Sequence, residues 1–339
     1  MNLYSQYVQI LSNRKLWNYN SNGTVEADIK TLFNSPYAFN FIKQYMFYSG
    51  KIRALPWSEI YKSESFEDRA SHTVSLFLLG ISATLNLGIA FDDIPRYYPD
   101  PYKNFLYLWS TMCLYHDIGY FYENHHAIVE ECPTINNFIK YGHIEYKLLD
   151  IIDDNILSEK YYKYRLYKYN KVDHGIAGGL LMYDRLMKDI SEQEKLYKQC
   201  VVYVGDTRRF SDTSRDTAKV MSHAILRHNM WFNNSDEYKK AGLGELVPKP
   251  DNSHKYYFKD NSLLFLLCLL DTIEPIKRNS TSCLKTTDIT FDAKDKELTI
   301  NIIDDSIDVS IYFDNIKNLE DWLQVHVDIN KHLATIKII

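Results

Sequence analysis

The chain has 339 residues, and its 45% hydrophobic and 24% charged residues are those of a folded globular protein with one large domain or two ordinary ones. The net charge of −5 argues against a broad nucleic-acid-binding surface, although a local basic groove is compatible with it. The five cysteines are scattered and form no Cys-x-x-Cys pair, which favours a reducing cytoplasm over a disulfide framework. The polar stretch Met1 to Lys15 shows no signal-peptide pattern.

The first third of the chain predicts helices. Residues 1–60 read as several short ones, with breaks near Asn20-Ser21-Asn22-Gly23 and Ser35-Pro36, and residues 64–88 as one long helix. From Thr73 to Phe91 that segment carries no charge and is long enough to span a bilayer. Its hydroxyl and amide side chains and its two glycines favour a buried helix over a membrane span.

Helical periodicity continues through the middle of the chain and changes near its end. After a proline-rich loop at 92–101, helices are predicted at 103–117, 135–152, 157–168, 174–188, 191–203, 215–229 and 260–274. Asp173 is expected to cap the 174–188 helix. Beyond residue 282, strands are predicted at Thr287–Phe291, Glu297–Ile303, Val309–Phe313 and Leu333–Ile339, with one short helix near Leu319–Leu323.

These patterns predict a mainly α fold with a small C-terminal α+β appendage. The expected divisions are an N-terminal helical extension over residues 1–60, a helical domain over 61–282 and the appendage over 283–339. The appendage carries no recognisable chemistry. We therefore favour a structural cap or a dimer surface over a ligand-sensing module.

Four polar residues lie in or beside strongly apolar helical stretches: His72, the pair His116-Asp117, and Asp271. Imidazoles and carboxylates are costly to bury without partners. A single shared metal ion is the simplest partner for all of them. His nitrogens with carboxylate oxygens suit a catalytic divalent ion that keeps an open position for water.

The ordered set resembles the HD superfamily of metal-dependent phosphohydrolases. Its central motif stands here as His116-Asp117-Ile118-Gly119-Tyr120, and the chain adds Asp173-His174-Gly175, His228-Asn229 and an apolar run before Asp271. The resemblance covers roughly residues 60–277 and implies an HD-type helical bundle. It also implies that His72, His116, Asp117 and Asp271 bind one metal, and that Asp117 bridges to a second.

The same resemblance makes His174 and His228 candidate ligands of a second metal. Asn229 stands where a second histidine is usual, so the second site is expected to be the weaker one. Hydrogen-bonded imidazoles at helix ends are the competing interpretation of both histidines. His143 and His223 are weaker candidates.

Substrate contacts are less defined than metal ligands. Tyr120 stands three residues after Asp117, where some HD nucleases and phosphodiesterases carry a lysine, and it could hydrogen-bond a phosphate oxygen. Arg227 or Arg185 could supply the missing positive charge, although a solvated helix face is the slightly favoured reading of both arginines. Asn229 is a further substrate-binding candidate.

The resemblance implies a phosphohydrolase acting on a nucleotide or small phosphoester, cyclic nucleotides included, through metal-activated water. The expected cofactors are one or two divalent ions, Mn, Fe, Ni, Co or Zn, with Mg as an alternative. One alternative function is an HD-type nuclease on single-stranded nucleic acid, which the acidic charge and the missing lysine disfavour. The other is a non-catalytic module that binds a nucleotide and reports it through the appendage. No membrane association is expected, and a homo-oligomer stays open.

Overall fold

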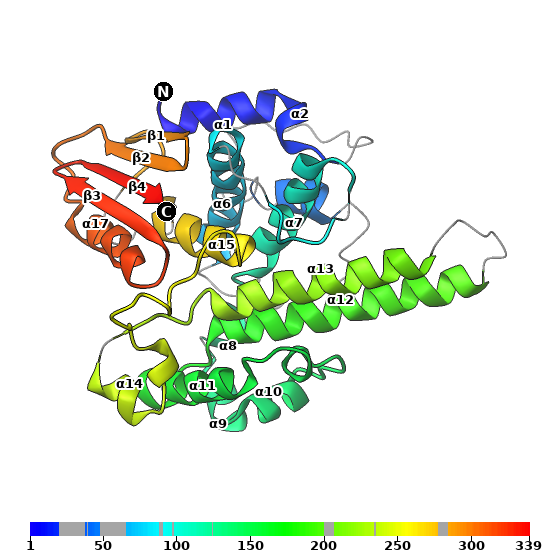
Figure 1. Cartoon of the computed structure of the whole chain (residues 1–339). Coiled ribbons are helices and arrows are strands. Elements are labelled where there is room, and N and C mark those ends of the chain that lie inside the picture. Colours follow the sequence, from blue (N-terminus) through cyan, green and yellow to red (C-terminus); the bar gives the residue numbers. More distant parts are fainter. Residues whose placement is uncertain are drawn as a thin grey trace.

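Figure 1 shows the chain as a computed structural model. It describes residues 1–19, 38, 40–47, 66–87, 91–96, 98–123, 125–199, 207–233, 235–276 and 284–339. These residues are mainly helical, with a small antiparallel sheet near the C-terminus, as the sequence predicts. The breaks expected near Asn20 and Ser35 and the boundaries expected at 60/61 and 282/283 lie outside the described residues, so the division into domains stays a prediction.

The helices begin with α1 (Leu3–Ser12), α2 (Arg14–Trp17) and the π-helix η1 (Ile42–Phe47). A core of long helices follows, made of α6 (Phe66–Asn86), α7 (Pro101–Tyr115), α12 (His174–Gln199), α13 (Thr207–Arg227) and α15 (Ser262–Ile273). Shorter elements connect them: α8 (Tyr120–Glu123), α9 (His126–Glu131), α10 (Ile135–Tyr141), η2 (Leu148–Asp150), α11 (Asn155–Tyr169), α14 (Asp236–Lys240) and η3 (Gly244–Leu246).

Burial explains why α6, α7 and α15 form the centre of the fold. All twelve residues of α15 are buried, as expected for a helix that is apolar on every side. Asp100 caps α7 by accepting hydrogen bonds from the backbone N–H groups of Tyr102 and Lys103, and Pro101 suits the first helical position. The stretch of α6 from Val74 to Leu79 is buried, which confirms the prediction of a buried helix. Among the described helices, none has the length and apolar character needed to cross a membrane.

The helices α12 and α13 run side by side as a long hairpin that projects from the body of the molecule (Figure 1). Gly179 allows this close approach, because a Cβ there would lie 2.6 Å from the carbonyl oxygen of Ser222. The two helices predicted at 174–188 and 191–203 are one helix as far as Gln199, since no glycine or proline lies at the predicted break between residues 188 and 191. The helix predicted at 135–152 is shorter and breaks after Tyr141, where His143 adopts a φ of 49°.

The appendage contains a four-stranded antiparallel sheet in the order β1-β2-β4-β3. Its strands are β1 (Ile289–Lys294), β2 (Glu297–Ile302), β3 (Val325–Asn330) and β4 (Leu333–Ile338), with α17 (Ser310–Lys317) and η5 (Asn318–Asp321) between β2 and β3. The β1–β2 hairpin turns through Asp295 and Lys296. Both residues have a positive φ, as the two central residues of a type I′ turn require.

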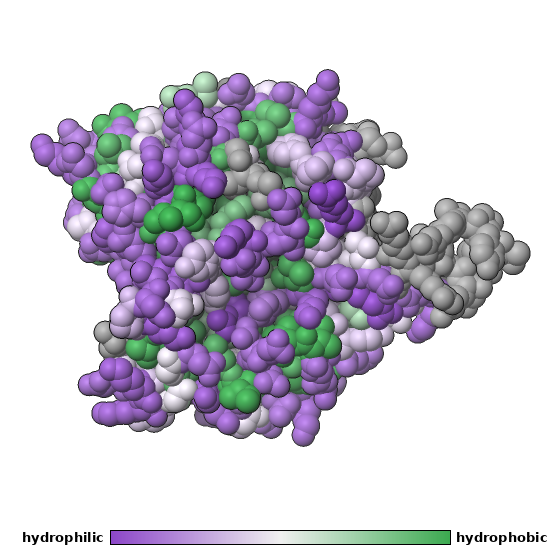
Figure 2. Space-filling model, in the orientation of Figure 1, coloured by the Kyte–Doolittle hydropathy of each residue, from purple (hydrophilic) through white to green (hydrophobic). Residues whose placement is uncertain are grey.

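The strand predicted at Val309–Phe313 was wrong, because Ser310–Lys317 is a helix that buries Tyr312, Phe313 and Ile316 at helical spacing. The strand β3 was not predicted. In the view of Figure 2, hydrophilic residues predominate on the surface and hydrophobic residues form small separate patches.

Candidate metal centre

Five core helices bring the predicted ligands together. His72 lies within α6, and Asp271 lies in the last turn of α15. His116 and Asp117 directly follow α7, His174 begins α12, and His228 directly follows α13. All six are buried.

The first group consists of His72, His116, Asp117 and Asp271. The Nε2 atom of His72 lies 3.1 Å from His116 Nε2, 3.1 Å from Asp271 Oδ1 and 3.6 Å from Asp117 Oδ2. His116 Nε2 lies 3.4 Å from Asp117 Oδ1 and 3.8 Å from Asp271 Oδ1. His72, His116 and Asp117 therefore offer potential ligand atoms within 4.8 Å of one another, and Asp271 lies beside the two histidines.

The second group consists of Asp117, His174 and His228, whose potential ligand atoms all lie within 4.8 Å of one another. The rings of His174 and His228 have centroids 5.3 Å apart, and His228 is 6.0 Å from the ring of His116. Asp117 thus belongs to both groups. The histidines predicted for a second ion lie beside the first group.

Each of the four histidines has an acceptor at its Nδ1 atom. These acceptors are Glu274 for His72 at 2.7 Å, the Cys113 carbonyl for His116 at 2.8 Å, Glu123 for His174 at 2.6 Å, and the Ile225 carbonyl for His228 at 2.6 Å. Carbonyls and carboxylates accept hydrogen bonds, so Nδ1 carries the proton and a neutral ring has its lone pair on Nε2. Such an arrangement is typical of metal-binding histidines, whose outer nitrogen is fixed by a carboxylate or carbonyl.

The chemistry of this donor set fits a divalent ion. Within the part of the chain that the structure describes, the buried Nε2 atom of His174 has no hydrogen-bond partner. A buried polar atom without a partner is costly, and a metal would satisfy it. These groups could therefore hold a metal ion, and their mixture of imidazole and carboxylate suits first-row transition metals.

Burial and neighbouring carboxylates shift the pKa values of the two histidines of the first group in opposite directions. Burial lowers the pKa of His116 to about 3, so this ring is neutral. Burial also lowers the pKa of His72, but its hydrogen bonds with Asp271 and Glu274 outweigh that effect and raise it to about 9. A metal at the first group would displace the proton from His72.

Local geometry explains how neighbours in the sequence face one site. His116 is the C-cap of α7, so Asp117 already lies outside the helix. The periodicity of the helix therefore does not set the direction of the Asp117 side chain. Gly119 brings this turn against the start of α12, because a Cβ there would lie only 2.0 Å from the carbonyl oxygen of His174. Packing against the start of α12 therefore requires a glycine at position 119.

Asp173 caps α12, as predicted, since its Oδ1 accepts from the backbone N–H of Ile176 at 2.9 Å. Its Oδ2 accepts from the side-chain amide of Asn229 at 2.7 Å. Asn229 therefore ties the end of α13 to the start of α12, beside His174. The structure gives Asn229 this supporting contact, and a contact with substrate stays a prediction.

A cation that the sequence analysis missed lies at the site. The Arg69 guanidinium donates to Asp117 Oδ2 at 2.9 Å, and its carbon lies 3.6 Å from the centre of the Tyr120 ring. Tyr120 in turn stacks on His174 with ring centroids 3.8 Å apart. The sequence does contain a signal for this arginine. Arg69 precedes His72 by three residues, and this spacing places both residues on the same face of the helix.

The two arginines chosen from the sequence have contacts elsewhere. Arg227 donates to the Tyr256 hydroxyl at 2.9 Å and pairs with Asp154 at 3.1 Å. Arg185 pairs with Asp189 at 3.2 Å, and the helical rise puts it about 16 Å along α12 from His174. Neither contact involves a candidate metal ligand.

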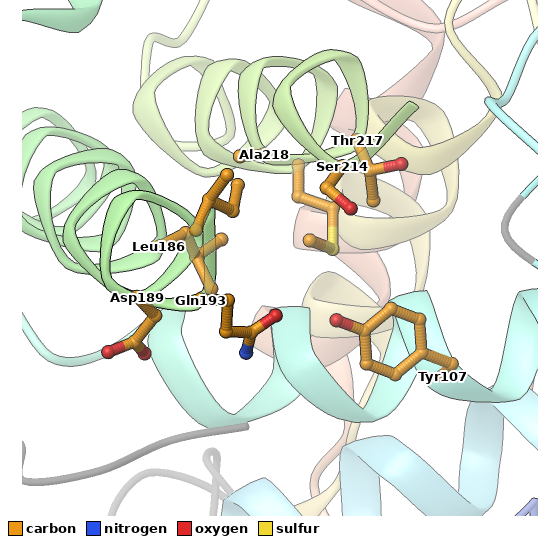
Figure 3. Close-up of a pocket in the computed structure, with 9 residues that line it drawn as sticks. Tyr107, Leu186, Asp189, Gln193, Ser214, Thr217 and Ala218 are labelled. Carbon is orange, nitrogen blue, oxygen red and sulfur yellow. The ribbon is translucent and has the colours of Figure 1, made fainter. Parts of the chain in front are cut away.

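A pocket lies between α7, α12 and α13 (Figure 3). Among its lining residues are Tyr107, Leu186, Asp189, Gln193 and Ser214. None of the residues that line it belongs to either ligand group, so it is separate from the candidate metal centre.

Two carboxylates that support the histidines were also missed. Glu274 follows Asp271 by three residues, and Glu123 follows Asp117 by six, but nothing in the sequence says which imidazole each one meets. Of the weaker candidates, His143 is exposed, and His223 pairs with Asp154 at 2.7 Å.

Comparisons with protein-family models, curated proteins and solved structures find no match for this chain. The mainly helical fold and its two His/Asp groups are nevertheless compatible with an HD-type site. The structure itself therefore defines the class of protein. It is a mainly helical protein with a buried cluster of residues that could bind a metal ion.

Proposed function

We propose that the protein is a metal-dependent phosphohydrolase of the HD type that acts on a nucleotide or another small phosphoester, cyclic nucleotides included. The observation that carries the proposal is the pair of ligand groups joined by Asp117. The order of the ligands along the chain supports it, because it is the order of the HD motif.

A divalent ion bound here would lower the pKa of a water molecule and stabilise charge on phosphoryl oxygens. The residues of the chain have separate tasks. The histidines present Nε2 atoms whose orientation is fixed from the opposite side of each ring. Asp117 belongs to both groups, so it would set the spacing of two ions. Burial of the cluster limits the access of bulk water.

Arg69 is placed to bind a phosphate of the substrate. Burial lowers its pKa, but Asp117 and Tyr120 outweigh that effect and raise it, so the guanidinium is charged throughout the physiological range. Its side chain is 28% exposed, whereas that of Asp117 is 7% exposed, so Arg69 is on the more accessible side of the pair. A guanidinium fork matches phosphate oxygens in charge and geometry.

The test combines metal content with a turnover panel of nucleotides, cyclic dinucleotides and single-stranded DNA, each with and without EDTA. We expect hydrolysis of a nucleotide or phosphoester that EDTA abolishes and Mn²⁺ or Co²⁺ restores. Asp117→Ala should abolish it, whereas Asp154→Ala, a carboxylate paired with His223 outside the ligand groups, should keep it. Hydrolysis that survives both chelation and Asp117→Ala would refute the proposal.

The panel also separates the alternatives. Cleavage of single-stranded DNA alone would favour the nuclease. Metal and nucleotide binding without turnover would favour the sensing module.

A further inference from the structure

Glu274 sits at the back of the candidate metal centre, completely buried. Its Oε2 atom accepts from Nδ1 of His72 at 2.7 Å. Its Oε1 atom accepts from the Ser75 hydroxyl and, at 3.0 Å, from the backbone N–H of Ile276. The carboxylate that orients a candidate ligand is therefore itself held by further groups.

The next group outward is Tyr7 of the N-terminal helix α1, which is also completely buried. Its hydroxyl lies 3.2 Å from the Ser75 carbonyl and 3.3 Å from the Ser75 hydroxyl. A continuous chain of hydrogen bonds thus runs from Tyr7 through Ser75 and Glu274 to His72. Buried polar networks whose members are all bonded are rigid and fix one arrangement of their groups.

Both α1 and the appendage are attached to this chain of hydrogen bonds. The first residues of α1 contact the start of the sheet, where the Tyr4 N–H donates to the Thr286 carbonyl at 3.1 Å and the Gln6 side chain donates to the Phe291 carbonyl. From the other side, the Tyr312 hydroxyl of α17 donates at 2.7 Å to the carbonyl of Ile273, the residue before Glu274. The appendage therefore contacts both the helix that carries Tyr7 and the residue that precedes Glu274.

We infer that Glu274 and Tyr7 are positioning residues for His72, and that α1 and the appendage thereby set how tightly the first group holds a metal ion. The inference rests on the proposed function, since it requires that His72 be a ligand. Groups that orient metal-binding histidines typically change metal affinity about 10- to 100-fold when altered. The appendage would then act on the metal centre without contributing a ligand.

The test is a Co²⁺ titration of the full-length chain, followed by visible absorption and by competition with a chelator. Tyr7→Phe removes the outer hydrogen bond and should weaken Co²⁺ binding about two- to tenfold. Tyr45→Phe is the matched control, because Tyr45 is a buried tyrosine whose hydroxyl donates to the Trp17 carbonyl and takes no part in the chain of hydrogen bonds. Tyr45→Phe should lower the melting temperature by about as much as Tyr7→Phe does, but it should leave the Co²⁺ affinity unchanged.

A second pair of variants tests the carboxylate. Glu274→Gln keeps the shape but not the charge, and should weaken the tighter Co²⁺ phase tenfold or more. Glu123→Gln alters the equivalent contact of His174 and should weaken the other phase instead. If wild-type protein binds Co²⁺ but Tyr7→Phe and Tyr45→Phe bind it equally well, the inference is overturned while the metal site stands. If wild-type protein binds no metal, the proposed function itself fails.

Discussion

Replacing Arg69 by methionine should separate substrate binding from metal binding. Methionine keeps an unbranched stem over the Tyr120 ring but removes the cation that donates to Asp117 at 2.9 Å. The guanidinium therefore competes with a metal ion for the carboxylate of Asp117, which belongs to both ligand groups. Arg69→Met should therefore leave metal affinity equal to that of wild type or raise it, while it weakens binding of the phosphate.

The magnitude follows from the contact that is lost. A hydrogen bond to a charged group contributes about 1.5–3 kcal/mol, which corresponds to a decrease of about tenfold to 150-fold in kcat/KM. The assay measures kcat/KM with metal at saturation, together with Co²⁺ affinity by titration. Arg215→Met is the control, because Arg215 pairs with Glu194 on the α12–α13 hairpin. An unchanged kcat/KM would refute the reasoning, and so would a loss of metal affinity parallel to the loss of rate.

Two further variants test other parts of the site. His174→Ala should remove the more weakly bound of two ions, which is measured as metal per chain by mass spectrometry. It should also reduce turnover about tenfold or more, because the second ion would orient the substrate. A variant with full metal content and the wild-type rate would show that His174 is structural. Gly119→Ala should lower the melting temperature, because overpacking against the His174 carbonyl costs about 1–3 kcal/mol, whereas Gly244→Ala, with open space around its Cβ, should leave it nearly unchanged. Equal melting temperatures for the two glycine variants would show that the turn at Gly119 adapts.

The sequence predicted the helical fold well because its signals are local. Polar residues in apolar helices identified His72, His116 and Asp271 as candidates, and the structure brings them together. Their partners could not be predicted in the same way. Glu274 meets His72 across 202 residues of sequence, and Arg69 reaches Asp117 from a different helix. Those contacts depend on how the helices pack, which spacing along one helix does not encode.

The appendage shows where local patterns mislead. Val309, Tyr312 and Phe313 are bulky residues of the kind that strands favour. Val309 is nonetheless the N-cap of α17, and Tyr312 and Phe313 lie within that helix, which contacts β3. The strand β3 was missed although Val325, Val327 and Ile329 alternate with polar residues along it, a pattern that is typical of a half-buried strand. Tertiary contacts decided the conformation of residues 310–317, whereas the local signal for β3 was present in the sequence.

The most direct test of the central claim is the metal content of the purified protein, compared between wild type and Asp117→Ala. Asp117 belongs to both ligand groups, so its loss should affect both ions. We predict that wild-type protein carries or takes up Mn, Fe, Ni, Co or Zn at up to two ions per chain, and that Asp117→Ala loses most of it. Wild-type protein that binds none of these metals would contradict the account.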